Sequence, residues 1–182
     1  MNIRSLLLGT VAAAALVSGA QAADLMVVQP SPVYEDVSAF SFEGFYAGVT
    51  VGGLGVQGGG SAGTLGIVAG ANFAVSDAIL AGIEFQADGL YHNGGFNSSE
   101  FLALGHLGAV VSDNVMIYAA LGGGAISTGG TTYGTWAYGV GAEVGVTDTI
   151  SLRGEVLGLH APSAPAGMQN AAKATVGVLF HF

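Results

Sequence analysis

The sequence contains no cysteine and few charged residues. Without cysteine, this chain of 182 residues is not held by disulfide bonds, so its stability depends on packing, backbone pairing or a membrane. Charged residues make up 8% of the chain and hydrophobic residues 51%, and only 3 residues are basic against 12 acidic ones. Because basic side chains are what neutralise phosphates, the sequence predicts no nucleic-acid partner.

Long apolar runs are also missing beyond residue 22. No stretch there reaches the roughly 18 apolar residues of a spanning helix without meeting a turn signal. The preceding segment has the order of a secretory leader: Arg4 is basic, Leu6 to Val17 are mostly apolar, and Ala20-Gln21-Ala22 is an A-x-A cleavage site. Residues 1–22 are therefore predicted to be a signal peptide, and an uncleaved anchor helix is the alternative.

A short motif occurs three times in the remaining chain. Each copy has valine, a hydroxyl residue, aspartate, any residue and a β-branched residue, and the aspartates are 36 and 35 positions apart. The copies are Val75-Ser76-Asp77-Ala78-Ile79, Val111-Ser112-Asp113-Asn114-Val115 and Val146-Thr147-Asp148-Thr149-Ile150. Aspartate, serine and threonine end strands by bonding nearby backbone, so each copy predicts a tight turn between two strands.

Four Gly-rich or Pro-containing segments lie between these turns and predict loops at the opposite rim, at Gln57–Gly63, His92–Ser98, Thr128–Thr132 and Ala161–Asn170. Three turns and four loops connect eight strands. The predicted strands are Gly44–Val56, Thr64–Val75, Ile79–Tyr91, Ser99–Val111, Val115–Ser127, Tyr133–Val146, Ile150–His160 and Ala171–Phe182. Each is long enough for a tilted transmembrane strand, so the predicted fold is all-β, an eight-stranded antiparallel up-and-down barrel over residues 44–182. Residues 23–43, with Pro30 and Pro32, are predicted to be an extended periplasmic linker.

Alternation of side chains predicts an apolar outside and a polar inside. The polar positions predict a buried lumen network made of Glu84, Asp88, His106, Glu143, Arg153, Glu155 and Lys173. Side chains fill the interior of a barrel of this size, so we expect a plugged lumen. His181 is expected to be solvated, and the interface girdle is predicted to contain Phe45, Tyr91, Tyr133, Trp136 and Tyr138. A soluble secreted β-sandwich is the fold alternative.

Both ends of the region resemble a known family. Ala23-Asp24-Leu25, Pro30-x-Pro32, Phe40-Ser41-Phe42-Glu43-Gly44-Phe45-Tyr46-Ala47-Gly48-Val49 and the alternation ending in Phe180 and Phe182 resemble the small outer-membrane proteins of alphaproteobacteria, the Omp25/Omp31 or porin-like family. Phe42 stands where the family usually has Trp. The resemblance implies an outer-membrane location, roles in envelope integrity and surface antigenicity, and haem binding for some members.

The predicted function is that of a structural barrel, contributing to envelope integrity and surface properties, and not an enzyme. Its expected partners are outer-membrane lipids and the assembly machinery, which would read Phe180 and Phe182 on the last strand. A narrow porin for small solutes and a haem or host-ligand receptor are the alternatives. His92 is the candidate rim ligand for haem, no catalytic residue is nominated, and no two histidines have metal-ligand spacing. A His160 and Ser163 esterase pair is conceivable but has no evident third partner.

Overall fold

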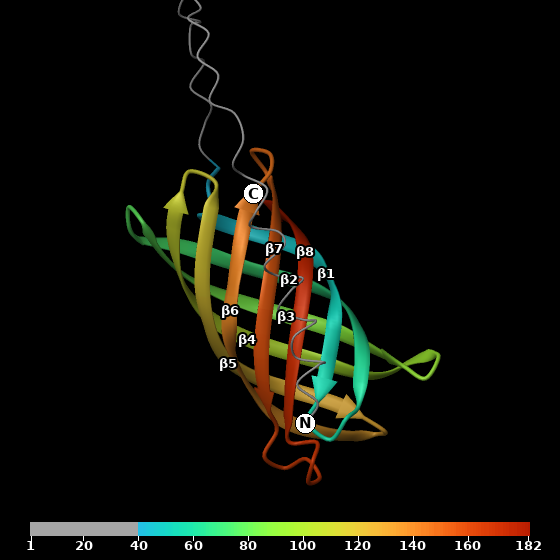
Figure 1. Ribbon diagram of the computed structural model, residues 1–182. Coiled ribbons are helices and arrows are strands. Elements are labelled where there is room, and N and C mark those ends of the chain that lie inside the picture. The colour runs from blue at the N-terminus through green and yellow to red at the C-terminus, as the bar shows by residue number, and fades with distance from the viewer. Residues whose placement is uncertain (1–39) are drawn as a thin grey trace, which may run out of the picture. The chain divides into compact units, whose positions relative to one another are not determined.

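The computed structural model describes residues 40–182, which form a closed barrel of eight antiparallel strands (Figure 1). Each strand pairs with the next in sequence, and the last pairs with the first. The strands are β1 (Gly44–Val56), β2 (Ser61–Ser76), β3 (Ile79–His92), β4 (Gly95–Ser112), β5 (Val115–Thr128), β6 (Thr131–Gly145), β7 (Ile150–His160) and β8 (Asn170–His181). The predicted fold class, strand number and meander order are therefore confirmed.

The two rims are named here by where the chain enters and leaves. The inner end is the rim where β1 begins and β8 ends, and the outer end is the opposite rim, which carries the longest connection, Ala161–Gln169 (Figure 1). In membrane barrels the inner end faces the periplasm. All three copies of the repeated motif form turns at the inner end, as predicted.

Three of the four outer connections are shorter than predicted by two or more residues, and the fourth is shorter by one, because β8 begins at Asn170. The expected loops at 92–98 and 128–132 are two-residue turns, Asn93-Gly94 and Gly129-Gly130, and the first loop shrinks to residues 57–60. Both residues of each two-residue turn have positive φ, which is the signature of a type I′ hairpin. Such turns let the strands continue to pair, so β3, β4, β5 and β6 extend further outward than the composition of these segments suggested.

The outer surface of the barrel is an apolar belt. Large side chains alternate with buried ones along every strand, and Ile67 is 64% exposed, Val140 62% and Val178 47%. A closed barrel pairs all its strand edges, so this surface can face hydrocarbon without unpaired backbone groups. None of the described residues forms a helix long and apolar enough to span a membrane.

One residue of the predicted aromatic girdle is misplaced. Phe45, Tyr91, Trp136 and Tyr138 are exposed on the outer surface, as predicted. Tyr133 instead lines the interior at the outer end. Tyr133 is two residues before the buried Thr135 and therefore faces inward with it, whereas Trp136 is on the outward-facing side of β6.

Residues before β1 pack into the inner end of the barrel. Phe42 is buried, its carbonyl oxygen accepts a hydrogen bond from Asn72 Nδ2 at 2.8 Å, and its ring lies edge-on to that of Phe40. Phe40 in turn contacts the ring of His181 with 4.8 Å between centroids. The described end of the predicted linker thus belongs to the packing of the barrel, while residues 1–22 and 23–39 lie outside the described residues.

Candidate functional site in the barrel lumen

Arg153 on β7 is the centre of the inner half of the lumen. Its Nε and Nη2 donate to Glu143 Oε2 on β6 at 3.0 and 2.7 Å, and its Nη1 donates to Glu84 Oε2 on β3. Glu143 lies directly opposite Arg153 in the β6–β7 register, whereas Glu84 reaches it from across the barrel. All three side chains are buried, so this is a desolvated ion-pair cluster that spans the lumen.

Two tyrosines hold the guanidinium group of Arg153. Its Cζ lies 4.8 Å from the ring centroid of Tyr46 on β1 and 5.3 Å from that of Tyr118 on β5, both within the range of a cation–π contact. The Tyr46 hydroxyl donates to Glu84 Oε2 at 2.5 Å, and the Tyr118 hydroxyl donates to Glu155 Oε2 at 2.9 Å. The tyrosines therefore supply packing and neutral hydrogen-bond donors together.

Lys173 on β8 forms a second cluster nearer the outer end. Its Nζ donates to Asp88 Oδ2 on β3 at 3.0 Å and to Glu100 Oε1 on β4. Asp88 and Glu100 lie opposite each other in the β3–β4 register, a placement that would be repulsive without the ammonium group between them. Lys173 is 1% exposed, so its charge is balanced by these carboxylates and not by solvent.

Gln86 on β3 connects the two clusters. Its Nε2 donates to Glu84 Oε1 at 2.8 Å and to Glu155 Oε1 at 2.7 Å, and its Oε1 accepts from Lys173 Nζ at 3.0 Å. The amide of Gln86 thus contacts Glu84 in the Arg153 cluster, Glu155, and the ammonium group of Lys173. The result is one continuous polar network, called here the lumen network, that takes side chains from every strand except β2.

The inner rim closes with His181 and Ser151. The Nε2 atom of His181 lies 2.7 Å from Glu143 Oε1, and the Ser151 hydroxyl donates to the same oxygen at 2.7 Å. The expectation that His181 is solvated is wrong, because Phe40 and Phe42 cover its ring. Both aromatic rings come from the segment before β1, which the strand pattern did not place.

His106 is the one predicted network residue that the structure keeps apart from the ion pairs. Its Nε2 lies 2.6 Å from Asn72 Oδ1, and its ring lies between those of Tyr46 and Tyr118. The other six predicted residues, Glu84, Asp88, Glu143, Arg153, Glu155 and Lys173, lie in the lumen network. His106 instead connects β4 to Asn72, whose side-chain amide donates to the Phe42 carbonyl oxygen.

Five buried carboxyl groups share two permanent cations in this lumen. Neutral donors add to these two cations: Tyr46 shares Glu84 Oε2 with Arg153, and Ser151 donates to Glu143 Oε1. Gln86 and Tyr118 donate to the two oxygens of Glu155. The predicted network did not name Gln86 or either tyrosine. Alternation could have found Tyr46, since an outward Phe45 requires an inward neighbour.

The remaining histidines lie at the outer rim. His92 Nδ1 is 2.8 Å from the Ser61 carbonyl oxygen, and His160 Nδ1 is 2.8 Å from Asn170 Oδ1 and is not bonded to Ser163. Within residues 40–182, no three His, Asp or Glu side chains are grouped so that they could hold a metal ion.

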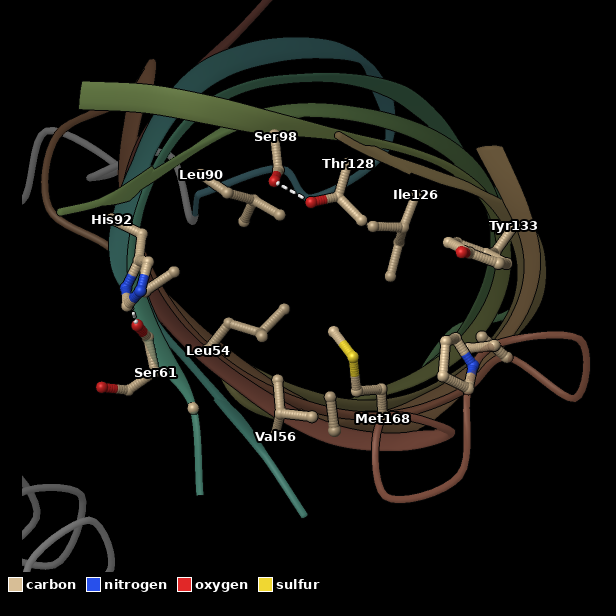
Figure 2. A pocket seen from close by; sticks show the side chains of 16 residues that line it. Leu54, Val56, Ser61, Leu90, His92, Ser98, Ile126, Thr128, Tyr133 and Met168 are labelled. Atoms are coloured by element: carbon tan, nitrogen blue, oxygen red, sulfur yellow. Dashed lines mark hydrogen bonds between the residues drawn. The ribbon is translucent and has the colours of Figure 1, made fainter. Parts of the chain in front are cut away.

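The outer half of the lumen is an apolar cavity of about 250 Å³ that opens at the outer end (Figure 2). Figure 2 shows Leu54, Leu90, Ile126 and Met168 pointing into it. These side chains come from β1, β3, β5 and the Ala161–Gln169 connection. The cavity was not anticipated from the sequence, because its wall combines strands with that connection.

Comparison with known proteins finds matches in structure only. No protein-family model matches the chain, and no curated protein matches its sequence. The attachment invasion locus protein Ail of Yersinia pestis superposes with a TM-score of 0.53 at 11% identity, covering 78% of this chain and all (100%) of Ail. Neisserial surface protein A superposes with a TM-score of 0.51 at 13% identity, covering 77% of this chain and 98% of its own.

These similarities concern the fold. Ail and neisserial surface protein A share the small closed barrel, and the apolar belt of the present chain is the surface that such a barrel presents to lipid. The protein therefore has the fold of these small membrane barrels. Membership of the Omp25/Omp31 family stays a prediction.

Proposed function

We propose that this protein is a structural component of the bacterial outer membrane, contributing to envelope integrity and surface properties through a barrel that does not conduct. The observation that carries the proposal is the lumen network. It joins Arg153, Gln86 and Lys173 across the barrel, and its members are almost completely buried. Catalysis forms no part of the proposal, since both basic side chains of the lumen are paired with buried carboxylates.

A narrow porin is the alternative that the network argues against. An eight-stranded barrel has an interior just wide enough for side chains. Here Tyr46, Leu157 and Leu179 are among the fully buried lumen residues, alongside the ionic groups. A solute would have to separate paired charges to pass, and breaking a buried ion pair is costly.

A receptor for anionic sugars is not supported either. A structure of Ail in complex with the heparin analogue sucrose octasulfate also superposes on this chain, with a TM-score of 0.54 at 11% identity. Binding a sulfated ligand calls for lysine or arginine, as in phosphate recognition. The four outer connections described here contain neither, so this ligand class is not carried over.

Haem binding, implied by the family resemblance, is only partly matched by the residues present. His92 offers one ring nitrogen for iron. No lysine or arginine in the described outer connections could pair with the haem carboxylates. Haem is therefore not part of the proposed function. A Soret shift on adding haem to the wild type, weakened by His92→Ala, would test whether it binds.

Recognition by the assembly machinery is proposed for the outward aromatic residues of the last strand. Phe180 and Phe182 face outward with 5.0 Å between ring centroids, and the Phe182 amide donates to the Phe45 carbonyl oxygen at 2.9 Å. Phe182→Ser is expected to lower the amount of assembled barrel in cells. Refolding of the same variant in detergent should be nearly unchanged, which separates recognition from stability.

Deletion of the gene in its own bacterium tests the structural role. We expect deletion to increase sensitivity to detergent and uptake of an outer-membrane-excluded dye, and the wild-type gene to restore both. The matched control is complementation with Leu65→Met, a lipid-facing change that should restore them equally. A deletion strain with an unaltered envelope, at normal wild-type expression, would contradict the proposal.

A further inference from the structure

The outer cavity is closed at its base. Leu54 lies opposite Lys173 in the β1–β8 register, and Ile126 lies opposite Glu100 in the β4–β5 register. Leu90 follows Asp88 by two residues on the same inward face of β3. The apolar wall thus continues directly from the Lys173 cluster, and the lumen network forms the end of a cup that opens only outward.

The rim of this cup carries no formal charge. Three of its polar side chains are already bonded: the Ser98 hydroxyl donates to Thr128 Oγ1 at 2.7 Å, and His92 Nδ1 contacts the Ser61 carbonyl oxygen (Figure 2). Acidic residues, lysine and arginine are absent from the four outer connections that the structure describes. An ion would have to leave water here without a partner, which is costly. The cup therefore favours an uncharged occupant.

The size and lining of the cup point to an alkyl group. An apolar cavity of about 150 Å³ stays dry and binds benzene, and this one measures about 250 Å³. The side chains that point into it in Figure 2, Leu54, Leu90, Ile126 and Met168, are aliphatic or a flexible thioether. Met adapts its shape to irregular apolar partners, and Met168 is half exposed on the connection beside the opening.

From these observations we infer that the outer cup binds one alkyl chain of an uncharged, single-chain amphiphile. The chain fills the space between Leu54, Leu90 and Ile126, and the uncharged head group stays at the rim beside Ser61 and Thr128. This binding site goes beyond the structural role proposed above, because a closed barrel does not need an open apolar cup.

Methionine methyl NMR of the full barrel in lipid nanodiscs tests the inference. Met168 lines the cup, and Met116 is fully buried in the lumen against Gly108, so one methyl group reports and the other serves as an internal control. The probe is n-octyl glucoside, titrated below its micelle concentration. We expect a saturable shift of the Met168 methyl signal while that of Met116 stays in place. The anionic n-octyl sulfate should bind at least about tenfold more weakly.

Variants separate the cup from general contact with lipid. Ala62→Trp, and independently Ala171→Phe, place a ring in the cup and should abolish the saturable shift. Leu65→Trp, an outward position on the same strand as Ala62, should leave it intact. Each variant is first shown to be folded by its heat-modifiable gel mobility. A Met168 shift that does not saturate, persists in both folded filling variants, or is equally strong with octyl sulfate would overturn the inference.

Discussion

The inner and outer halves of the lumen share one backbone pattern and carry opposite chemistry. Along β3 the inward side chains run Glu84, Gln86, Asp88 and then Leu90, and along β8 they run from His181 through Lys173 to Ala171. On these two strands the last ionisable side chain is followed outward by an aliphatic one, Leu90 after Asp88 and Ala171 after Lys173. The alternation of strands fixes which side chains face inward, while the residue types along each strand decide whether that level of the lumen is closed or open.

The two halves should also respond differently to substitution. In the inner half the side chains around Arg153 are buried and bonded to one another, so removing one of them leaves others unpaired. In the outer half the apolar walls already border empty space, so added volume meets little resistance. Four predictions test this contrast.

The largest effect is expected for Arg153→Met. It leaves Glu84 and Glu143 buried without their cation and removes the contacts with both tyrosine rings. The free energy of unfolding should fall by about 3–5 kcal/mol, measured by urea titration in lipid vesicles. Leu152→Met, next along β7 and facing lipid, is the matched control and should change little. Equal stability of the two variants would mean that the network does not hold the inner half.

Gln86→Leu tests whether the two clusters act as one network. It removes a partner from Glu84, Glu155 and Lys173 at once, although Gln86 itself carries no charge. The expected loss is about 2–3 kcal/mol, since more than one buried group loses its hydrogen bond. Phe85→Leu on the outer face is the control in the same titration. A loss no larger than that of the control would show that the clusters are independent.

Gly124→Ala tests the close strand contact between the two halves. A Cβ atom at Gly124 on β5 would meet the backbone carbonyl oxygen of Phe101 on β4, whereas one at Gly134 on β6 would meet nothing within 4 Å. We expect Gly124→Ala to cost about 1–2 kcal/mol and Gly134→Ala to be nearly neutral, in parallel urea titrations. Similar values for both would place the strands further apart than described.

The smallest effect is expected for a ring placed in the cup. Ala62→Trp should change the free energy of unfolding by less than about 1 kcal/mol, because the ring enters existing space. Ala120→Trp puts the same ring at a buried position opposite His106, where overpacking should cost about 1–3 kcal/mol. Urea titrations of the two variants compare the losses directly. A larger loss for Ala62→Trp than for Ala120→Trp would contradict the description of the two halves.

Much of the fold follows from the sequence, because three repeated turns and a two-residue period determine strand number and facing. Arg153 and Lys173 could be placed in the lumen this way, together with most of their acidic partners. The contacts themselves could not, since Glu84 meets Arg153 across the barrel and not along a register that adjacent strands define.

The outer cup and the packing of Phe40 and Phe42 at the inner end could not be predicted from the sequence for a different reason. Met168 enters the cup from a connection whose path no periodicity describes, and Phe42 enters the inner end from a segment outside the strands. The lengths of two outer connections were overestimated, because Asn93-Gly94 and Gly129-Gly130 are compatible with both longer loops and tight hairpins. Local composition therefore predicted longer loops where the backbone conformation continues the strand pairing.

Electrical recording on the full barrel in planar lipid bilayers tests the central claim most directly. Protein whose folding is verified by an unboiled against boiled gel shift is inserted and recorded at fixed voltage in potassium chloride. Because the lumen network spans the barrel from Glu143 to Lys173, we expect no steady conductance above the bare membrane. A stable, ohmic current that rises in step with each insertion would show an open lumen and contradict the account.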